Sequence, residues 1–123
     1  MIMLDIDFFK KINDTHGHLV GDEVLVLMCN LIKNSIRESD YLIRWGGEEF
    51  LILTPEIDLD AAVKLAEKLR ILIEKNEFIA VGSITISLSV VQKNDDELLE
   101  NLLKRLDNLL YDSKRSGRNK TSF

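Results

Sequence analysis

Two β-rich runs, at residues 41–45 and 49–53, lie on either side of the pair Gly46-Gly47. A glycine pair in this position favours a tight hairpin, because glycine tolerates positive φ. The two runs are therefore expected to pair as antiparallel strands, with Pro55 closing the second one. A chain that contains this hairpin must build a sheet that is at least partly antiparallel.

Periodic patterns in the rest of the chain predict further strands and helices. An apolar run at 2–7 and an alternating apolar and hydroxyl run at 84–90 are typical of strands. Apolar residues at steps of three and four predict helices at about 22–38, 59–73 and 99–110. The order strand, helix, hairpin, helix, strand, helix predicts an α+β domain with a mainly antiparallel central sheet flanked by helices.

The connecting segments carry turn and cap signals. Residues 8–21 are predicted to form a polar loop, and Asp22 could cap the helix that follows. Residues 94–96 are cap candidates for the third helix, and Gly117 would stop that helix. A short last strand is expected from Asn119.

Composition restricts the class of partner. The 123 residues suffice for one domain, 1–123, and the balance of 46% hydrophobic and 30% charged residues is typical of a folded chain. A net charge of −5 argues against binding long nucleic acids, which requires clustered Lys and Arg. The charge does not exclude a small phosphate ligand held through a magnesium ion and a few cations.

The single cysteine and the lack of a long apolar run indicate the cellular compartment. Cys29 is the only cysteine, so the chain forms no internal disulfide and suits a reducing cytoplasm. No apolar run approaches the roughly 20 residues needed to cross a bilayer, so no membrane contact is expected from this segment. Residues 1–4 read as the middle of a buried strand, and we expect the chain to be a fragment of a longer signalling protein.

Asp5 and Asp7 lie two residues apart at the predicted end of the first strand. Side chains at this spacing point to the same side of a sheet. A hard cation such as magnesium would relieve their repulsion and desolvation, and it could keep phosphate oxygens in its shell. The same pattern occurs at solvated strand ends, so the spacing alone leaves both interpretations open.

Glu48 and Glu49 place two more carboxylates beside the glycine pair. Because adjacent strand residues face opposite ways, only one of the two is expected to turn easily toward Asp5. The glycines leave room for a bulky ligand to approach the backbone. Taken alone, this arrangement is more often an ordinary turn with a solvated rim.

Four successive motifs resemble the signatures of GGDEF domains, the diguanylate cyclase family, in a GGEEF variant. They are Leu4-Asp5-Ile6-Asp7-Phe8-Phe9-Lys10-Lys11-Ile12-Asn13-Asp14, Gly17-His18-Leu19-Val20-Gly21-Asp22, Arg44-Trp45-Gly46-Gly47-Glu48-Glu49-Phe50 and Lys114-Arg115-Ser116-Gly117-Arg118-Asn119. Their order and separations also match, over nearly the whole chain. The resemblance implies a fold similar to the nucleotidyl cyclase and polymerase palm class, with a ferredoxin-like βαββαβ core.

The resemblance also implies a reaction in which the 3′-hydroxyl of one GTP attacks the α-phosphate of another, pyrophosphate leaves, and a second such step closes cyclic di-GMP. It implies Mg²⁺ as the cofactor, held by Asp5, the backbone carbonyl of Ile6 and Glu48, with Glu48 as the catalytic proton acceptor. The residues that it assigns to GTP are Phe8, Phe9, Lys10, Asn13, His18, Asp22, Gly46, Gly47, Lys114 and Arg118.

The chemistry of these side chains agrees with the implied roles. Phosphoryl transfer is accelerated mainly by positioning and by cations on the phosphate oxygens, which Lys114 and Arg118 could supply beside the metal. Asp22 can accept from guanine N1 and N2, and the amide of Asn13 can both donate and accept, which would favour GTP over ATP. Lys114 and Arg118 are also explained as cations at a helix C-terminus. Asp22 is also explained as a cap, and Asn13 and His18 as loop hydrogen bonders.

Arg37 and Asp40 form an RxxD motif just before the Gly-Gly signature, where the family has an inhibitory product site. The resemblance implies that they bind cyclic di-GMP and slow its synthesis. An arginine fork suits a phosphate or a guanine edge, and an aspartate suits the N1 and N2 donors. The alternative is an ordinary surface salt bridge at a helix end.

The family pattern also implies partners. Each active site would hold one GTP, so activity requires a homodimer, usually arranged by an upstream sensory or linker domain. The helical segment with a DxLTGLxNR-like motif that normally precedes the first strand is missing here, so this chain could bind or turn over GTP poorly. Ser87-Leu88-Ser89 stands where Ser-Ile-Gly is usual, a mild departure.

Two other classes of function compete with the cyclase. A non-catalytic receptor would bind cyclic di-GMP through Arg37 and Asp40, but it would not need the clustered carboxylates of Asp5, Glu48 and Glu49. An adenylate cyclase or polymerase palm fragment would share the fold without requiring the two guanine-reading residues.

Overall fold

The computed structural model describes residues 1–123, which fold around a five-stranded sheet in the order β2-β3-β1-β6-β7. The strands are β1 (Ile2–Ile6), β2 (Tyr41–Arg44), β3 (Glu49–Leu53), β6 (Ile86–Val90) and β7 (Thr121–Ser122). All neighbouring strands pair antiparallel except β6 and β7, which pair parallel. The α+β fold and the mainly antiparallel sheet predicted from the sequence are confirmed.

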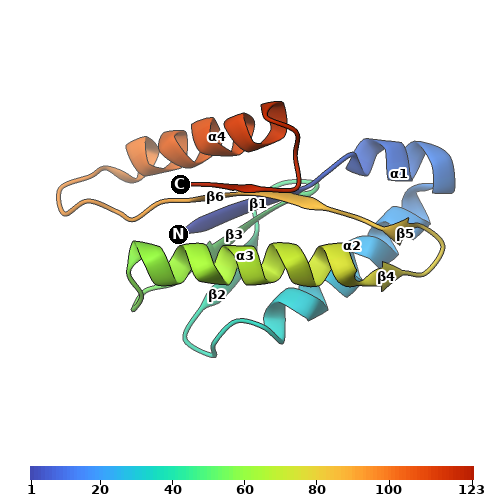
Figure 1. Ribbon diagram of the computed structural model, residues 1–123, viewed down its shortest axis with the longest axis horizontal. Coiled ribbons are helices and arrows are strands. Elements are labelled where there is room, and N and C mark those ends of the chain that lie inside the picture. Colours follow the sequence, from blue (N-terminus) through green and yellow to red (C-terminus); the bar gives the residue numbers. More distant parts are fainter.

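The chain forms four helices, three of which cover the two faces of this sheet. They are α1 (Phe9–His16), α2 (His18–Lys33), α3 (Leu59–Lys75) and α4 (Leu99–Arg115). In Figure 1, α4 lies on one side of the sheet and α3 with α2 on the other, while α1 extends beyond the end of β1. None of these helices combines the length and apolar character that a membrane-crossing helix requires.

Alternation along β1 distributes the core between the two faces. Ile2, Leu4 and Ile6 are fully buried in the large apolar cluster under α2 and α3. Met3 points the other way, into a smaller cluster with leucines of α4. Asp5 follows the same alternation and therefore faces the α4 side, at the end of the strand. This placement brings the last turn of α4 close to the first of the predicted functional carboxylates.

The predicted loop at 8–21 is wrong, because α1 fills most of it and α2 begins at His18. Phe9 is buried and Ile12, three residues later, packs against the same core, so the segment has an apolar side in spite of its turn residues. Gly17, at φ 88°, separates the two helices. The helix predicted at 22–38 therefore starts four residues earlier, and it ends at Lys33.

Other predicted boundaries also change. Asp22 lies inside α2 and does not cap it, because the N-cap is Gly17. The N-cap of α4 is Leu98, without a side-chain hydrogen bond, so residues 94–96 are not its cap. Gly117 does follow the end of α4, at φ 117°. A short hairpin of β4 (Glu77–Phe78) and β5 (Gly82–Ser83) was not predicted.

Ser89 on β6 leads to a prediction about stability. Its side chain is fully buried and its hydroxyl has no hydrogen-bond partner. Ser89→Ala should raise the free energy of unfolding by about 1 kcal/mol, because the penalty for burying an unpaired hydroxyl is removed. Ser87→Ala is the matched control and should destabilise, because the Ser87 hydroxyl donates to Asp7 at 2.6 Å. Urea unfolding measures both variants, and a less stable Ser89→Ala protein would contradict the expectation.

Candidate active site

Three acidic residues come from neighbouring backbone segments where β1 ends and the Gly-Gly turn leads into β3. Asp5, which is 4% exposed, is the cross-strand neighbour of Glu49 in the pairing of β1 with β3. Glu48 lies in the turn, and its backbone carbonyl accepts a hydrogen bond from the N–H of Ile6 at 3.4 Å. The strand pairing itself therefore brings the acidic ends of two sequence motifs together.

The electrostatics of Asp5 reflect this crowding. Burial raises the pKa of its carboxyl to about 6, and the charges of Glu48 and Glu49 also raise it. Lys114, in the last turn of α4, opposes these effects, with its Nζ 2.7 Å from Oδ2 of Asp5. The site holds more negative charge than its own lysine balances, so it favours binding a further cation.

The charges of both Glu48 and Glu49 raise the pKa of Asp5, and that only one of the two side chains turns toward Asp5 stays a prediction. Strand alternation governs Glu49, which belongs to β3 and faces the same side as Asp5. It does not govern Glu48, because this residue precedes the strand and its direction is set by the turn. Glu48 is the larger of the two contributions to the raised pKa of Asp5.

The glycine pair has a different role from the one predicted. Neither Gly46 nor Gly47 adopts positive φ. A Cβ on Gly46 would instead lie 2.9 Å from Oε2 of Glu49, so a larger residue here would displace the end of the Glu49 side chain. Arg44 fixes the turn by donating from Nη2 to the carbonyl of Gly47 at 2.7 Å and from Nε to that of Gly46 at 3.3 Å.

The donor set fits a magnesium ion of the predicted kind. No three His, Cys, Asp or Glu side chains form a ready-made cage. Asp5 and Glu48 offer two carboxylates. The backbone carbonyl of Ile6 accepts no backbone hydrogen bond outside the regular helices and strands, so it offers a third oxygen ligand. Mg²⁺ is commonly held by one or two carboxylates, with the rest of its octahedral shell filled by water or substrate phosphate.

Asp7 is on the same side of the sheet as Asp5, as its spacing predicted, but it is already committed to other partners. Its carboxylate accepts from the hydroxyls of Thr85 at 2.7 Å and Ser87 at 2.6 Å, and from the backbone N–H of Asn119 at 3.0 Å. Three donors satisfy this buried carboxylate without a metal. The idea that Asp5 and Asp7 share one cation is therefore not supported.

The predicted phosphate ligands gather beside the carboxylates. Arg118 lies over the ring of Phe8, with its Cζ 4.4 Å from the ring centre. Phe8, at φ 59°, precedes α1, which has no side-chain cap, so the first amides of that helix, at Phe9 and Lys10, are available as donors. The structure thus brings Phe8, Arg118 and Lys114 to the same end of the molecule from opposite ends of the chain.

The predicted guanine ligands lie on α1 and α2. Asn13 is half-buried, whereas His18 and Asp22 are exposed. Asn13 packs so tightly on Gly21 that a Cβ there would lie 1.9 Å from its Oδ1. No sequence pattern indicates that Gly21 sets the position of Asn13, because the contact depends on the angle between the two helices.

Gly21→Ala should lower the affinity for GTP about tenfold, because the new methyl group displaces the Asn13 amide. Any loss of stability should come from the buried ring of Phe9, whose Cζ would lie 3.3 Å from the new Cβ, since the Asn13 side chain can move and alanine favours a helix over glycine. Calorimetric titration with a GTP analogue that cannot release pyrophosphate measures the effect, with thermal melting as the control for folding. Unchanged affinity for the analogue would contradict the role given to Asn13.

Arg37 and Asp40 lie in the connection between α2 and β2. They do not form an ion pair, and the Asp40 carboxylate accepts from the backbone N–H of Arg37 at 2.9 Å. Both line a cavity of about 310 Å³, together with Lys68 of α3. The surface salt bridge considered for this motif is thus absent, and the motif borders a cavity separate from the carboxylates.

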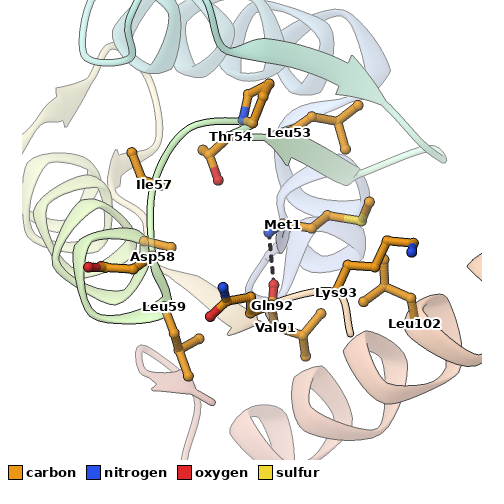
Figure 2. A pocket seen from close by; sticks show the side chains of 12 residues that line it. Met1, Leu53, Thr54, Ile57, Asp58, Leu59, Val91, Gln92, Lys93 and Leu102 are labelled. Carbon is orange, nitrogen blue, oxygen red and sulfur yellow. Dashed lines mark hydrogen bonds between the residues drawn. The ribbon is translucent and has the colours of Figure 1, made fainter. Parts of the chain in front are cut away.

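Another cavity, of about 300 Å³, lies at the opposite end of β1 (Figure 2). It borders the amino group of Met1, which donates to the carbonyl of Val91 at 2.8 Å. Its lining is mostly apolar, and its one acid, Asp58, caps α3 and points away from the space in Figure 2. Lacking clustered charges, this cavity does not resemble a nucleotide site.

The antiparallel βαββαβ sheet and the acidic cluster at the end of its central strand define a domain of the nucleotidyl cyclase type. The family model "Diguanylate cyclase, GGDEF domain" matches residues 1–120. The chain belongs to this GGDEF family.

Curated relatives and solved structures agree with that family. The chain is 39% identical over 120 residues to diguanylate cyclase DgcM of Escherichia coli K12, covering 98% of this chain and 29% of the relative. It is 40% identical over 127 residues to diguanylate cyclase A of Treponema denticola, covering 100% of this chain and 34% of the relative. The chain thus spans about a third of the length of these relatives.

Among solved structures, diguanylate cyclase SiaD of Pseudomonas aeruginosa, in complex with its activator SiaC, has a TM-score of 0.93 at 40% identity, over 99% of this chain and 48% of that one. The GGDEF domain of DgcB from Caulobacter crescentus, in complex with c-di-GMP, has a TM-score of 0.90 at 30% identity, over 98% of this chain and 74% of that one.

Proposed function

We propose that this domain is a diguanylate cyclase, which condenses two GTP molecules into cyclic di-GMP and releases two pyrophosphates. The observation that supports the proposal is that Asp5 pairs with Glu49 across the sheet, contacts Lys114 and lies beside the turn that holds Glu48. Two carboxylates and a backbone carbonyl suit Mg²⁺, and the neighbouring cations suit a triphosphate. Membership of the GGDEF family supports the same reaction.

In the proposed mechanism, each residue acts mainly by position and charge. Asp5, the carbonyl of Ile6 and Glu48 would hold Mg²⁺, which would supply positive charge to the phosphate oxygens during transfer. Glu48 accepts the proton of the attacking 3′-hydroxyl, and Lys114 and Arg118 neutralise the triphosphate. The amides at the start of α1 add donors for phosphate oxygens.

Guanine recognition is proposed to rest on α1 and α2. Asp22 accepts from guanine N1 and N2, Asn13 donates and accepts at the same edge, and His18 contacts the nucleoside. Adenine has no donor at N1, so ATP would leave the carboxylate of Asp22 unpaired, at a cost in affinity.

The reaction joins two substrates held in two domains, so the active form is proposed to be a homodimer. Its assembly would be arranged by a sensory or linker domain elsewhere in a longer protein, as expected from relatives about three times the length of this chain. GTP as the substrate places the proposed activity in the cytoplasm.

The experiment that tests the function is incubation with GTP or ATP and Mg²⁺, followed by chromatography of the products. Cyclic di-GMP from GTP alone is the expected result. Cyclic AMP from ATP would indicate an adenylate cyclase, and binding of cyclic di-GMP without synthesis would indicate a receptor. The full-length protein is assayed beside the domain, because dimerisation can depend on the rest of the protein.

A product-binding site at Arg37 and Asp40 is proposed as the brake on synthesis. The cavity that both residues border, with Lys68 at its edge, supports this proposal. Arginine and lysine suit the two phosphates of cyclic di-GMP, and the free oxygen of Asp40 suits guanine donors. Calorimetry with cyclic di-GMP should show binding that Arg37→Ala removes, and binding unaffected by that change would reject this site.

A further inference from the structure

The turn after α4 has an unusual backbone that its own sequence does not explain. Gly117, Arg118 and Asn119 all have positive φ, at 117°, 62° and 46°. Non-glycine residues rarely adopt this conformation, and two in succession require outside support. This turn is also the segment that carries Arg118, one of the two cations assigned to the triphosphate.

The support comes from the residue that directly follows β1 and from α3. Asp7 accepts from the backbone N–H of Asn119 at 3.0 Å. The Asn119 side chain donates to Glu74 at 2.7 Å and accepts from Arg70 at 2.9 Å. Asp7, 112 residues earlier in the chain, therefore holds the backbone of Asn119, and α3 holds its side chain.

This anchoring has a consequence for Arg118. The backbone N–H of Arg118 donates to Ser113 at 3.0 Å, which fixes the start of the turn, and Asp7 fixes its end. Between these two points the guanidinium is held over Phe8, which directly follows Asp7. The position of the cation is thus set by the same short segment that contains the proposed metal ligand Asp5.

Taking the proposed cyclase function as its basis, we propose that Asp7 is a positioning residue that, with Asn119, holds the left-handed turn so that Arg118 lies where the triphosphate binds. Asp7 acts through Arg118 and is not a metal ligand. The proposal explains why a buried carboxylate so near the metal site takes all its hydrogen bonds from Thr85, Ser87 and Asn119.

The test is Asp7→Asn in the full-length protein, because the amide cannot accept all three donors. The KM for GTP and the Kd for the α,β-methylene analogue of GTP should both rise about tenfold, with kcat within about threefold and the Mg²⁺ requirement unchanged. In an Arg118→Ala background the same change should add less than about twofold, since the two residues act as one unit. Thr85→Val is the matched control: it removes one bond to Asp7 but leaves the turn attached, and it should leave the affinity within about twofold.

Asn119→Gly is the second variant, used also if Asp7→Asn does not fold. Glycine tolerates the backbone of this position and retains the N–H that donates to Asp7, but it loses the bonds to Arg70 and Glu74. The Kd for the analogue should rise about threefold.

Unchanged affinity in the folded variants rejects the inference, as does an Asp7→Asn protein whose main defect is a raised Mg²⁺ requirement. A wild-type protein that does not bind the analogue rejects the proposed function, and this inference with it, whereas wild-type binding with intact variants rejects the inference alone.

Discussion

Asp5→Asn is expected to lower kcat/KM for GTP by about a thousandfold, a loss of roughly 4 kcal/mol of transition-state stabilisation. Asp5 is the most buried of the three clustered carboxylates and the one that Lys114 contacts directly. An amide of the same shape keeps the fold but carries no charge to hold Mg²⁺. Product formation at saturating Mg²⁺, measured by chromatography, gives the loss.

The same substitution should have the opposite effect on stability. Because the pKa of Asp5 is raised from 3.8 to about 6, the folded state binds its proton more tightly than the unfolded chain does. The metal-free domain therefore loses stability as the pH rises through this range. At pH 7.5 with chelator, Asp5→Asn should melt at a higher temperature than the wild type, and the difference should vanish below pH 3.8.

Asp107→Asn is the matched control, because Asp107 lies on the exposed side of α4. It should change neither activity nor the pH dependence of melting. An Asp5→Asn enzyme that retains activity within tenfold would show that Asp5 does not hold the metal. A variant that melts lower at neutral pH would instead show that the Asp5 charge stabilises the fold.

The order of the main elements could be predicted because each has a clear hydrophobic period. The alternation in 84–90 and the glycine pair at 46–47 each specified a strand environment from local sequence alone. The short helix α1 could not be predicted in the same way. Its eight residues include several turn formers, and only the packing of Phe9 and Ile12 on the rest of the core shows that it is helical.

The residues of the candidate site could be predicted better than their hydrogen-bond partners. Asp5 and Asp7 were expected on one face and lie there, since a period of two requires it. Their different partners could not be predicted, because Ser87 and Asn119 approach Asp7 from strands and turns distant in sequence. The hydroxyls that alternate along 84–90 were the one available signal, because they had to donate to some acceptor.

The orientation of the two glutamates depended on a single boundary. The alternation rule would have separated Glu48 from Glu49 if both had been strand residues. β3 begins at Glu49, so Glu48 belongs to the turn and strand alternation does not set its direction. One residue at an element boundary therefore decides whether the alternation rule can be applied to Glu48.

Lys114→Met is expected to lower kcat/KM for GTP about a hundredfold at pH 7, through two separate losses. One is the loss of a cation beside the triphosphate. The other concerns Asp5, since Lys114 opposes the rise in its pKa through a hydrogen bond and through its charge. Without the lysine, the pKa of Asp5 should rise further, and a larger fraction of this carboxyl should be protonated at pH 7.

The pH dependence separates these two losses. A proton on Asp5 competes with Mg²⁺, so the Mg²⁺ requirement of the wild type should increase below pH 6, and that of Lys114→Met should increase already at a higher pH. Raising the pH should restore the metal-dependent part of the activity but not the part lost with the phosphate contact. Lys114→Arg should keep both effects small, and Lys104→Met, an exposed change on the same helix, should have none. An unshifted Mg²⁺ requirement in Lys114→Met would mean that the 2.7 Å contact with Asp5 does not control the ionisation of this carboxyl.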